Sequence, residues 1–272
     1  MRVSDSNTAV LEECWHPRAL AATAGDGPDR RSCARSWLIL ADATGVGEAL
    51  AARLRANREQ VTVARWGTTW RQHDAHFELR AGERGDMDRL LTAVTASGRI
   101  DDVVHLWSLE TRSTETCGDR DPVSASLDPS KTLAVISALH LAQALVQAGS
   151  LARLWFTTRG TQLASTAHEP NAAPTENQQA VLAAAINDLA LSFGRKHPEL
   201  RCTTIDLDGA SRAPAQVTSL TAELMADDPE TRIAWRRGTR YAARLVAAQW
   251  SGEATREGLD RHVHVLPRIG VS

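Results

Sequence analysis

Tyrosine and cysteine are scarce in this chain, and their scarcity limits the chemistry it can carry. Tyr241 is the only tyrosine, so any reaction that needs a tyrosine hydroxyl has one candidate. The four cysteines, Cys14, Cys33, Cys117 and Cys202, form no CxxC pair and have no histidine cluster beside them. This pattern argues against a zinc site and against a disulfide scaffold, and it fits a reducing compartment.

Excess charge and long apolar runs are also lacking. The formal net charge is −2 and the isoelectric point is about 6.5, so nothing points to nucleic acid or to an anionic membrane. The N-terminal residues are polar, and no window resembles a signal peptide or a membrane span. We therefore expect a cytoplasmic protein with no metal and no nucleic-acid or membrane partner.

A third glycine is missing where a dinucleotide-binding turn would need it. Leu38–Leu50 reads as a buried strand, a turn with Thr44, Gly45 and Gly47, and the start of a helix. In the dinucleotide fingerprint the third glycine lets the helix pack close to the strand. Here that place holds Leu50, which we expect to hold the helix off the strand, and Glu48 brings negative charge where a pyrophosphate would bind. The turn is interpreted as vestigial, with no cofactor bound.

Apolar runs alternate with helical periodicities along the chain. Strands are predicted at Trp37–Ala41, Val61–Trp66, Val103–Trp107, Leu154–Thr157 and Cys202–Leu207, and helices at Gly47–Ala56, Met87–Ser97, Lys131–Ala148, Gln178–Lys196 and Val217–Met225. This alternation predicts an α/β fold, a truncated Rossmann-like, doubly wound parallel sheet. Arg232–Trp235 and Arg240–Val246 around Arg237-Gly238-Thr239 predict a terminal β-hairpin. An early strand near Glu12–Trp15 and this hairpin are expected at the sheet edges.

Segments without periodicity set the expected domain limits. Ser108–Ser130 and Gly160–Asn177 are long and polar, which is typical of site-bordering loops or of slack surface. The tail Ser251–Ser272 has only Val263, Val265 and Leu266 as a strand-like group. We expect one domain over residues 1–250 and a linker or docking tail over residues 251–272.

Six runs, taken together and in order, resemble one protein family. They are Cys14-Trp15-His16-Pro17; Trp37–Asp42 with Gly45-Val46-Gly47; Val103–Ser108; Leu154–Gly160; His197–Cys202 with Asp206-Leu207-Asp208; and Gly238–Leu245. Over roughly residues 10–247 the chain resembles the N-terminal structural subdomain of the ketoreductase of modular type I polyketide synthases, a relative of the short-chain dehydrogenases. The resemblance implies two Rossmann-like halves, of which only the C-terminal half binds NADPH and carries a Lys/Ser/Tyr/Asn catalytic set. Only 27 residues follow Leu245, which we expect to be too few for a second half.

The catalytic residues that the resemblance implies are not in place. A reductase of this superfamily needs a hydroxyl donor and a tyrosine whose pKa a nearby lysine lowers. The strand that would present the serine ends in Thr157-Thr158-Arg159-Gly160, and Asn177–Val181 stands where the tyrosine would be. The only lysines, Lys131 and Lys196, are not four residues from Tyr241. We therefore assign no catalytic residue.

Other chemistry-bearing residues have simpler interpretations. Arg65 stands where an NADP enzyme places a cation for the 2′-phosphate, but chance placement is favoured. The pairs His73 and His76, and His262 and His264, lack further ligands and are interpreted as solvated loop positions rather than a metal site. His140 is interpreted as a core or boundary histidine. A triad of Ser108, His105 and Asp101 or Asp102 lacks a nucleophile elbow and is disfavoured. Trp37, Trp107 and Trp155 are expected to fill core space on the sheet.

Three functions stay open. The leading hypothesis is a non-catalytic pseudo-ketoreductase, a scaffold that is not itself an enzyme and that supports neighbouring synthase domains such as a methyltransferase or an enoylreductase. The second is the structural half of an active NADPH-dependent ketoreductase whose catalytic half lies on another segment. The third is a free-standing NADP-dependent short-chain reductase. The isolated chain is expected to be a monomer.

Overall fold

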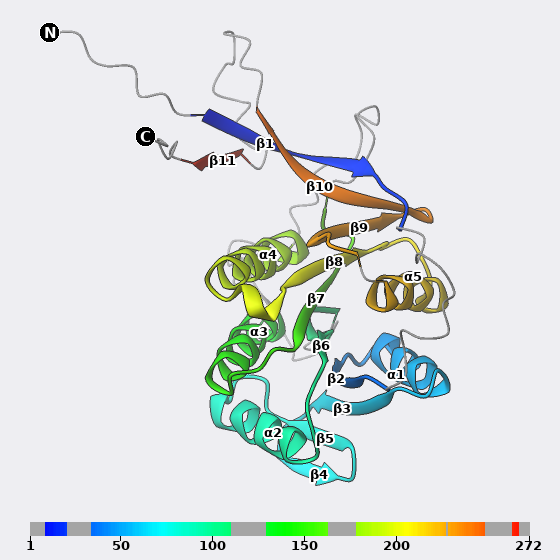
Figure 1. Ribbon diagram of the computed structural model, residues 1–272, viewed down its shortest axis with the longest axis vertical. Helices are drawn as coiled ribbons and strands as arrows, with labels where there is room; N and C mark the ends of the chain where they lie inside the picture. Colours follow the sequence, from blue (N-terminus) through cyan, green and yellow to red (C-terminus); the bar gives the residue numbers. More distant parts are fainter. Residues whose placement is uncertain are drawn as a thin grey trace, which may run out of the picture.

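The computed structural model describes residues 9–20, 34–109, 129–162, 178–226, 228–247 and 263–266. They form an eleven-stranded sheet in the order β11-β1-β10-β9-β8-β7-β6-β2-β3-β5-β4. Helices cover both faces of its central part, and the two ends of the sheet are antiparallel (Figure 1). The predicted α/β class is thereby confirmed.

The central strands run parallel, as the alternation of strands and helices predicts. They are β2 (Ser36–Ala41), β3 (Gln60–Trp66), β6 (Asp102–His105), β7 (Arg153–Arg159), β8 (Thr203–Leu207) and β9 (Arg232–Arg236). β2 pairs with β3 on one side and with β6 on the other, and β7, β8 and β9 follow in turn. Strands buried on both faces read as continuous apolar runs, which is why these segments could be recognised in the sequence.

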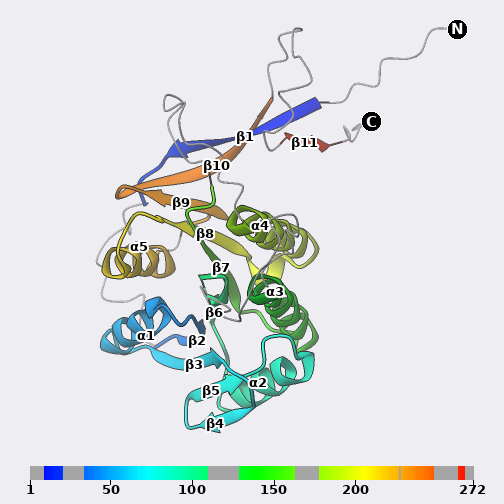
Figure 2. The ribbon, with the colours of Figure 1, turned by 180° about the vertical axis from the view of Figure 1, so that it is seen from behind.

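The helices divide between the two faces of the sheet. α1 (Val46–Ala56) and α5 (Ala213–Met225) pack together on one face, and α2 (Arg84–Ala96), α3 (Pro129–Gln147) and α4 (Gln178–Lys196) pack side by side on the other (Figures 1 and 2). Each face has its own apolar core, the first around Trp37 and Trp155 and the second around Trp107 and Phe156. Trp37, Trp107 and Trp155 are fully or almost fully buried, as expected. No described helix is long and apolar enough to cross a membrane.

The antiparallel end joins segments from both ends of the chain. β10 (Thr239–Ala247) forms the predicted hairpin with β9, and its turn places Arg237 and Gly238 at φ 48° and 78°. β1 (Ala9–Pro17) lies between β10 and β11 (Val263–Leu266), so the expectation that the early strand forms the edge is wrong. The predicted strand near Glu12–Trp15 is shorter than β1 because acidic residues break the alternation in Ala9–Pro17. The division at residue 250 stays a prediction, although β11 pairs with the main sheet.

A buried ion pair ties this antiparallel end to α5. Arg240 on β10 donates to Glu223 on α5 from Nε at 2.5 Å and from an amino group at 3.2 Å, and both side chains are almost inaccessible to solvent. Arg240 also lies 3.4 Å from Asp228 and donates to the Arg18 carbonyl, just after β1. Since an unpaired charge is costly when buried, these contacts fix the position of the hairpin.

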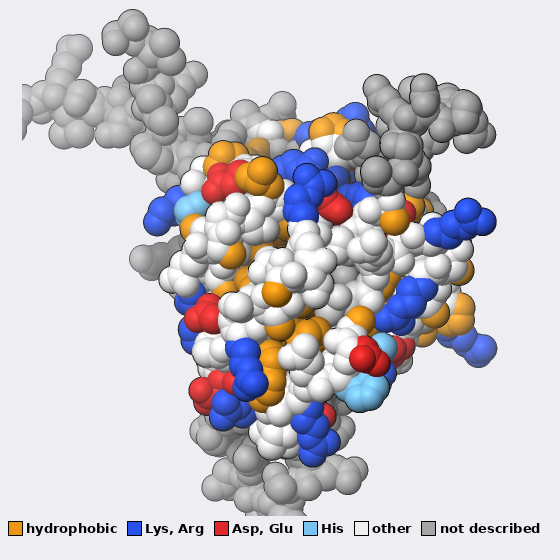
Figure 3. Space-filling model, turned by 60° about the horizontal axis from the view of Figure 1, so that its bottom comes forward, with side chains coloured by type: hydrophobic (Ala, Val, Ile, Leu, Met, Phe, Trp, Pro, Cys, Tyr) orange, Lys and Arg blue, Asp and Glu red, His pale blue; other side chains and the backbone are white. Residues whose placement is uncertain are grey.

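The opposite end of the sheet differs from the sequence expectation. A short antiparallel hairpin is formed here by β4 (Arg71–His73) and β5 (His76–Leu79). His73 and His76 are exposed to solvent, but they lie on strands, so the expectation that they lie in a loop is wrong. Phe77 and Leu79 are buried while His76 is exposed and Glu78 is partly exposed, and this alternation anchors β5 beside β3. Figure 3 views this end, where hydrophobic, basic, acidic and histidine side chains are interspersed. The described residues contain no cluster of three metal-ligating side chains.

Candidate functional site

Ligands of doubly wound folds bind beyond the carboxyl ends of the parallel strands. In this protein the turns after β2, β7 and β8 come together there, formed by residues 42–45, 160–162 and 208–210. The segments 110–128 and 163–177, which hold most of the two predicted polar loops, lie outside the described residues. The site is therefore assessed from the strand ends and the turns next to them.

The turn between β2 and α1 needs both of its glycines. Gly45 has φ 93°, in the left-handed region that favours glycine. A Cβ on Gly47 would lie only 2.6 Å from Cβ of Ala41, so the first turn of α1 packs directly on β2. The expectation that Leu50 holds the helix off the strand is thus wrong, since Leu50 is fully buried in the core one turn later and Gly47 provides the close contact.

The amide groups of this turn bind a carboxylate of the chain itself. Asp42, at the end of β2, accepts hydrogen bonds from the Gly47 amide at 2.8 Å, from the Thr44 amide at 3.0 Å and from the Thr44 hydroxyl. Asp42 is only 4% exposed. In a dinucleotide-binding fold these amides would face the pyrophosphate. The structure therefore brings Thr44, Gly45 and Gly47 together as predicted, but around Asp42, which the sequence interpretation missed.

Two arginines beside this turn, Arg65 and Arg159, are already bonded to side chains of the protein itself. Arg65, near the end of β3, donates to Glu48 on α1 from its Nε at 2.8 Å and from an amino group at 2.7 Å. Arg159, at the end of β7, donates to the Thr44 hydroxyl at 3.1 Å. Burial lowers the pKa of Arg159, and the nearby charge of Asp42 opposes that shift. The cation that a 2′-phosphate would need is thus already paired with Glu48.

Trp107 occupies the space beside the end of β6. β6 ends at His105, two residues earlier than predicted, and Trp107 lies in the short 3-10 helix η1 (Trp107–Leu109). Its indole Nε1 donates to the Ala41 carbonyl at 3.2 Å, and its ring centroid lies 5.9 Å from that of Trp66. Trp107 is fully buried, as expected, but at a strand end rather than within a strand.

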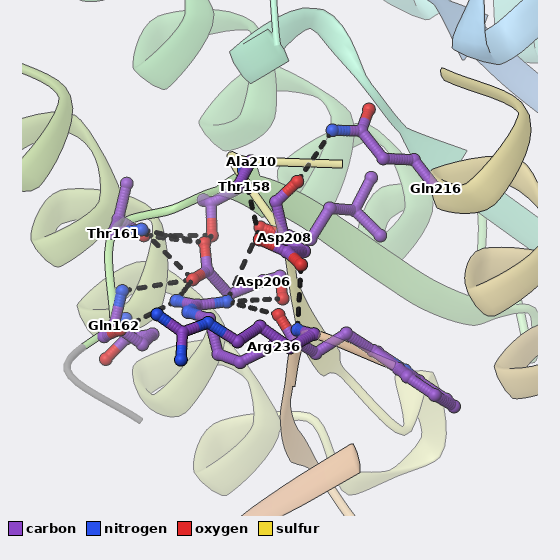
Figure 4. Close-up of polar contacts among 11 residues, drawn as sticks. Thr158, Thr161, Gln162, Asp206, Asp208, Ala210, Gln216 and Arg236 are labelled. Carbon is purple, nitrogen blue, oxygen red and sulfur yellow. Dashed lines mark hydrogen bonds and ion pairs between the residues drawn. The ribbon is translucent and has the colours of Figure 1, made fainter. Parts of the chain in front are cut away.

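The ends of β7 and β8 are joined by a polar cluster around Asp206 (Figure 4). The Asp206 carboxylate accepts from the Thr158 hydroxyl at 2.6 Å, from the Thr161 hydroxyl at 2.7 Å and from the Thr161 and Gln162 amides at 3.0 Å. Arg236 on β9 completes the cluster with an ion pair to the same carboxylate. Asp206 is 2% exposed. The hydroxyl at Thr158, where a reductase would present its serine, is therefore committed to an internal contact.

Two turns close over this cluster. The Gly160 amide donates to the Leu207 carbonyl at 2.8 Å, and a Cβ on Gly160 would lie 3.4 Å from Cα of Gly209.

The chain's only tyrosine, Tyr241, lies on β10, where it pairs with Pro17 of β1 and with Ala234 of β9. The strand ends therefore bring no tyrosine beside Thr158 within the described residues.

The disfavoured triad does not assemble. His105 bonds through Nε2 to the Ser137 hydroxyl on α3 at 2.9 Å, not to Ser108, whose hydroxyl donates to the Thr157 carbonyl. Asp102 accepts from Trp155 Nε1 at 2.9 Å and pairs with Arg35. Complete burial lowers the pKa of His105 to about 3, so the ring stays neutral. Ser137 was missed because its partner lies on another element.

His140 fits its interpretation as a boundary histidine. It is partly exposed on α3, and burial is the main reason why its pKa is lowered. His262 lies outside the described residues.

Comparisons with solved structures relate this arrangement to known proteins. The adenylation, ketoreductase and pseudo Asub multidomain structure of a keto acid-selecting nonribosomal peptide synthetase module matches 90% of this chain and 19% of its own, at 18% identity and a TM-score of 0.69. A C2-type ketoreductase from a modular polyketide synthase matches 89% of this chain and 44% of its own, at 21% identity and a TM-score of 0.58. The chain therefore shares the fold of these ketoreductases. A short-chain dehydrogenase from Streptomyces avermitilis matches 75% of this chain and 88% of its own, at 15% identity and a TM-score of 0.51.

The chain spans less than half the length of these multidomain and modular ketoreductase structures. No protein-family profile and no curated protein match it. The first two of these structures come from synthase modules, and the first contains an adenylation domain together with its ketoreductase.

These comparisons contradict the expectation that the chain is not an enzyme. The sequence led us to expect a chain that is not an enzyme, on the ground that its catalytic residues are missing. The solved structures that it resembles are ketoreductases and short-chain dehydrogenases, which are enzymes, and nothing supports a non-enzymatic role. The residues that the sequence lacks therefore do not exclude a role in an enzyme.

Proposed function

We propose that this chain is the structural half of an NADPH-dependent ketoreductase of a modular synthase. A catalytic half on another segment binds NADPH and reduces the ketone, and this chain stabilises it. The observation that carries the proposal is the position of Asp42. Its carboxylate accepts hydrogen bonds from the Thr44 and Gly47 amides, which would otherwise bind the pyrophosphate of NADPH. The residues of this turn therefore do not fit NADPH.

Three further observations support the proposal. Arg65 is paired with Glu48, the Thr158 hydroxyl is bonded to Asp206, and Tyr241 lies in the antiparallel end of the sheet. The ketoreductase structures are about twice as long as the part that this chain matches, which leaves room in them for a second half.

The antiparallel end is the surface that we assign to the catalytic half. β10, β1 and β11 extend beyond the helices (Figures 1 and 2), and Val246 on β10 is 38% exposed. An exposed strand with apolar side chains is suited to pairing with another domain. This surface joins segments from both ends of the described chain, so docking there would also hold those ends together.

The test is complementation in two pieces. The segment encoded beside this chain is expressed alone and together with it, and NADPH-dependent reduction of a β-ketoacyl thioester is measured. We expect the chain to raise both the activity and the melting temperature of the neighbouring segment. Val246→Asp should weaken this effect, whereas Leu151→Asp, the same kind of apolar-to-charged change at a site that is 70% exposed just before β7, should not.

Equal activity and stability of the neighbouring segment without this chain would contradict the proposal. Reduction by this chain with no second segment present would favour the free-standing reductase instead.

A further inference from the structure

A groove runs along α4 on the side away from the strand ends of the candidate site. Two cavities of about 510 and 540 Å³ form it, and they share Leu191, Arg195 and Thr231. The first reaches Leu245 on β10, and the second reaches Arg201, just before β8. We name this feature the α4 groove.

One wall of the α4 groove is a strand with an open edge. β10 pairs with β1 from Tyr241 to Ala247 but with β9 only from Thr239 to Ala242. Among the described residues, 243–247 therefore have no strand on their second edge, a length of about 16 Å at 3.3 Å per residue. Ala243, Arg244 and Leu245 line the first cavity, and Leu245 is 46% exposed. An added strand would satisfy these backbone groups and cover this side chain.

The ion pairs within the groove leave it with an excess of positive charge. Arg232 pairs with Glu13 and Arg244 pairs with Glu230. Arg195 and Arg201 are exposed and have no acidic partner in the part of the chain that the structure describes, whereas one exposed acid, Asp188, lines the groove.

Arg153 and Asp228 line the inner end of the second cavity, and the contacts of Arg153 lie within the chain. The Arg153 side chain is buried, stacks on Trp155 and donates to the Thr203 hydroxyl at 3.3 Å and to the Asp228 carbonyl at 3.1 Å. The occupant that matches the exposed Arg195 and Arg201 is therefore acidic.

We propose that the α4 groove docks an extended, acidic segment of a partner protein. The segment adds as a strand to residues 243–247 of β10 and places carboxylates beside Arg195 and Arg201. A second copy of this chain that paired symmetrically through the same groove fits less well, because it would bring its own Arg195 and Arg201 close to these. The Val246 side chain points to the other face of β10, so this docking is separate from the contact proposed for the catalytic half and does not rest on it.

The experiment uses the full chain and a fluorescein-labelled ten-residue peptide in which glutamate alternates with valine and threonine. A peptide with lysine in place of glutamate is the reference. We expect the acidic peptide to bind and to be weakened by salt, and the lysine peptide not to bind. Arg195→Glu with Arg201→Glu should weaken binding roughly tenfold or more, the size expected for two lost charge contacts.

Arg58→Glu with Arg212→Glu is the matched control, because both arginines are exposed, lie outside the groove and have no acidic partner among the described residues. Circular dichroism checks that both double variants melt like the parent. Hydrogen exchange should slow at the amides of 243–247 when the acidic peptide is bound.

Three results would overturn the proposal. The first is that the acidic peptide does not bind at about 1 mM, a concentration that corresponds to about 4 kcal/mol of affinity. The second is equal binding of the acidic and the basic peptide, and the third is an equal loss of binding in the control variant. Binding without any exchange protection at 243–247 would overturn the assignment of the strand position.

Discussion

Replacing Asp42 tests the most specific feature of the site. Asp42→Ala removes the acceptor for two amides and one hydroxyl at the start of α1. Hydrogen bonds to a charged group contribute about 1.5–3 kcal/mol each, and loss of a helix cap costs about 0.5–2 kcal/mol. Because water can reach the emptied turn and satisfy part of this loss, we expect a destabilisation of about 2–4 kcal/mol.

Urea unfolding followed by tryptophan fluorescence measures this change, and a melting curve should shift by roughly 5–12 °C at this chain length. Glu48→Ala, which removes a partly exposed acid near the same turn, is the control and should cost less than about 1 kcal/mol. Asp42→Ala should also gain more stability from added sulfate than the parent does, since its amides are free for an anion. A variant within about 0.5 kcal/mol of the parent would refute the placement of Asp42.

Three further predictions concern buried groups. Trp107→Ala should destabilise by roughly 3–5 kcal/mol, because a fully buried ring and its bond to Ala41 are lost; thermal unfolding like that of the parent would place the ring on the surface. Arg240→Met should destabilise by about 3–5 kcal/mol by leaving Glu223 unpaired, whereas Arg240→Met with Glu223→Gln should regain much of it, as urea unfolding of both variants can establish. The pKa of His105 is lowered to about 3 in the folded chain, so the unfolded chain takes up a proton first and stability falls as pH drops from about 6.5 towards 3, by up to about 1.4 kcal/mol per pH unit. A His105 imidazole signal that titrates near pH 6 in nuclear magnetic resonance spectra would contradict this.

The central sheet was predictable because its signals are local. Apolar runs marked β2, β3, β7 and β8, and the helical periodicity of Gln178–Lys196 matches α4 in both bounds. The hairpin could be predicted from the turn sequence Arg237-Gly238. In the structure both residues have positive φ angles, as a tight two-residue hairpin turn requires.

The site was less predictable because its contacts join distant residues. Asp206 lies 45 residues from Thr161, and no sequence spacing connects them. Asp42 had a local signal, since an aspartate two residues before a threonine often bonds to its amide, but the missing third glycine drew attention to Leu50 instead. The β4–β5 hairpin was missed because its strands are short and mostly polar, although the alternation at Phe77 and Leu79 marked it.

Titration of NADPH by calorimetry tests the central claim most directly. We predict no saturable binding to this chain at up to about 1 mM, because Asp42 fills the α1 turn, and one site per complex once the catalytic half is added. Micromolar, one-to-one binding by this chain in the absence of a second segment would contradict the account.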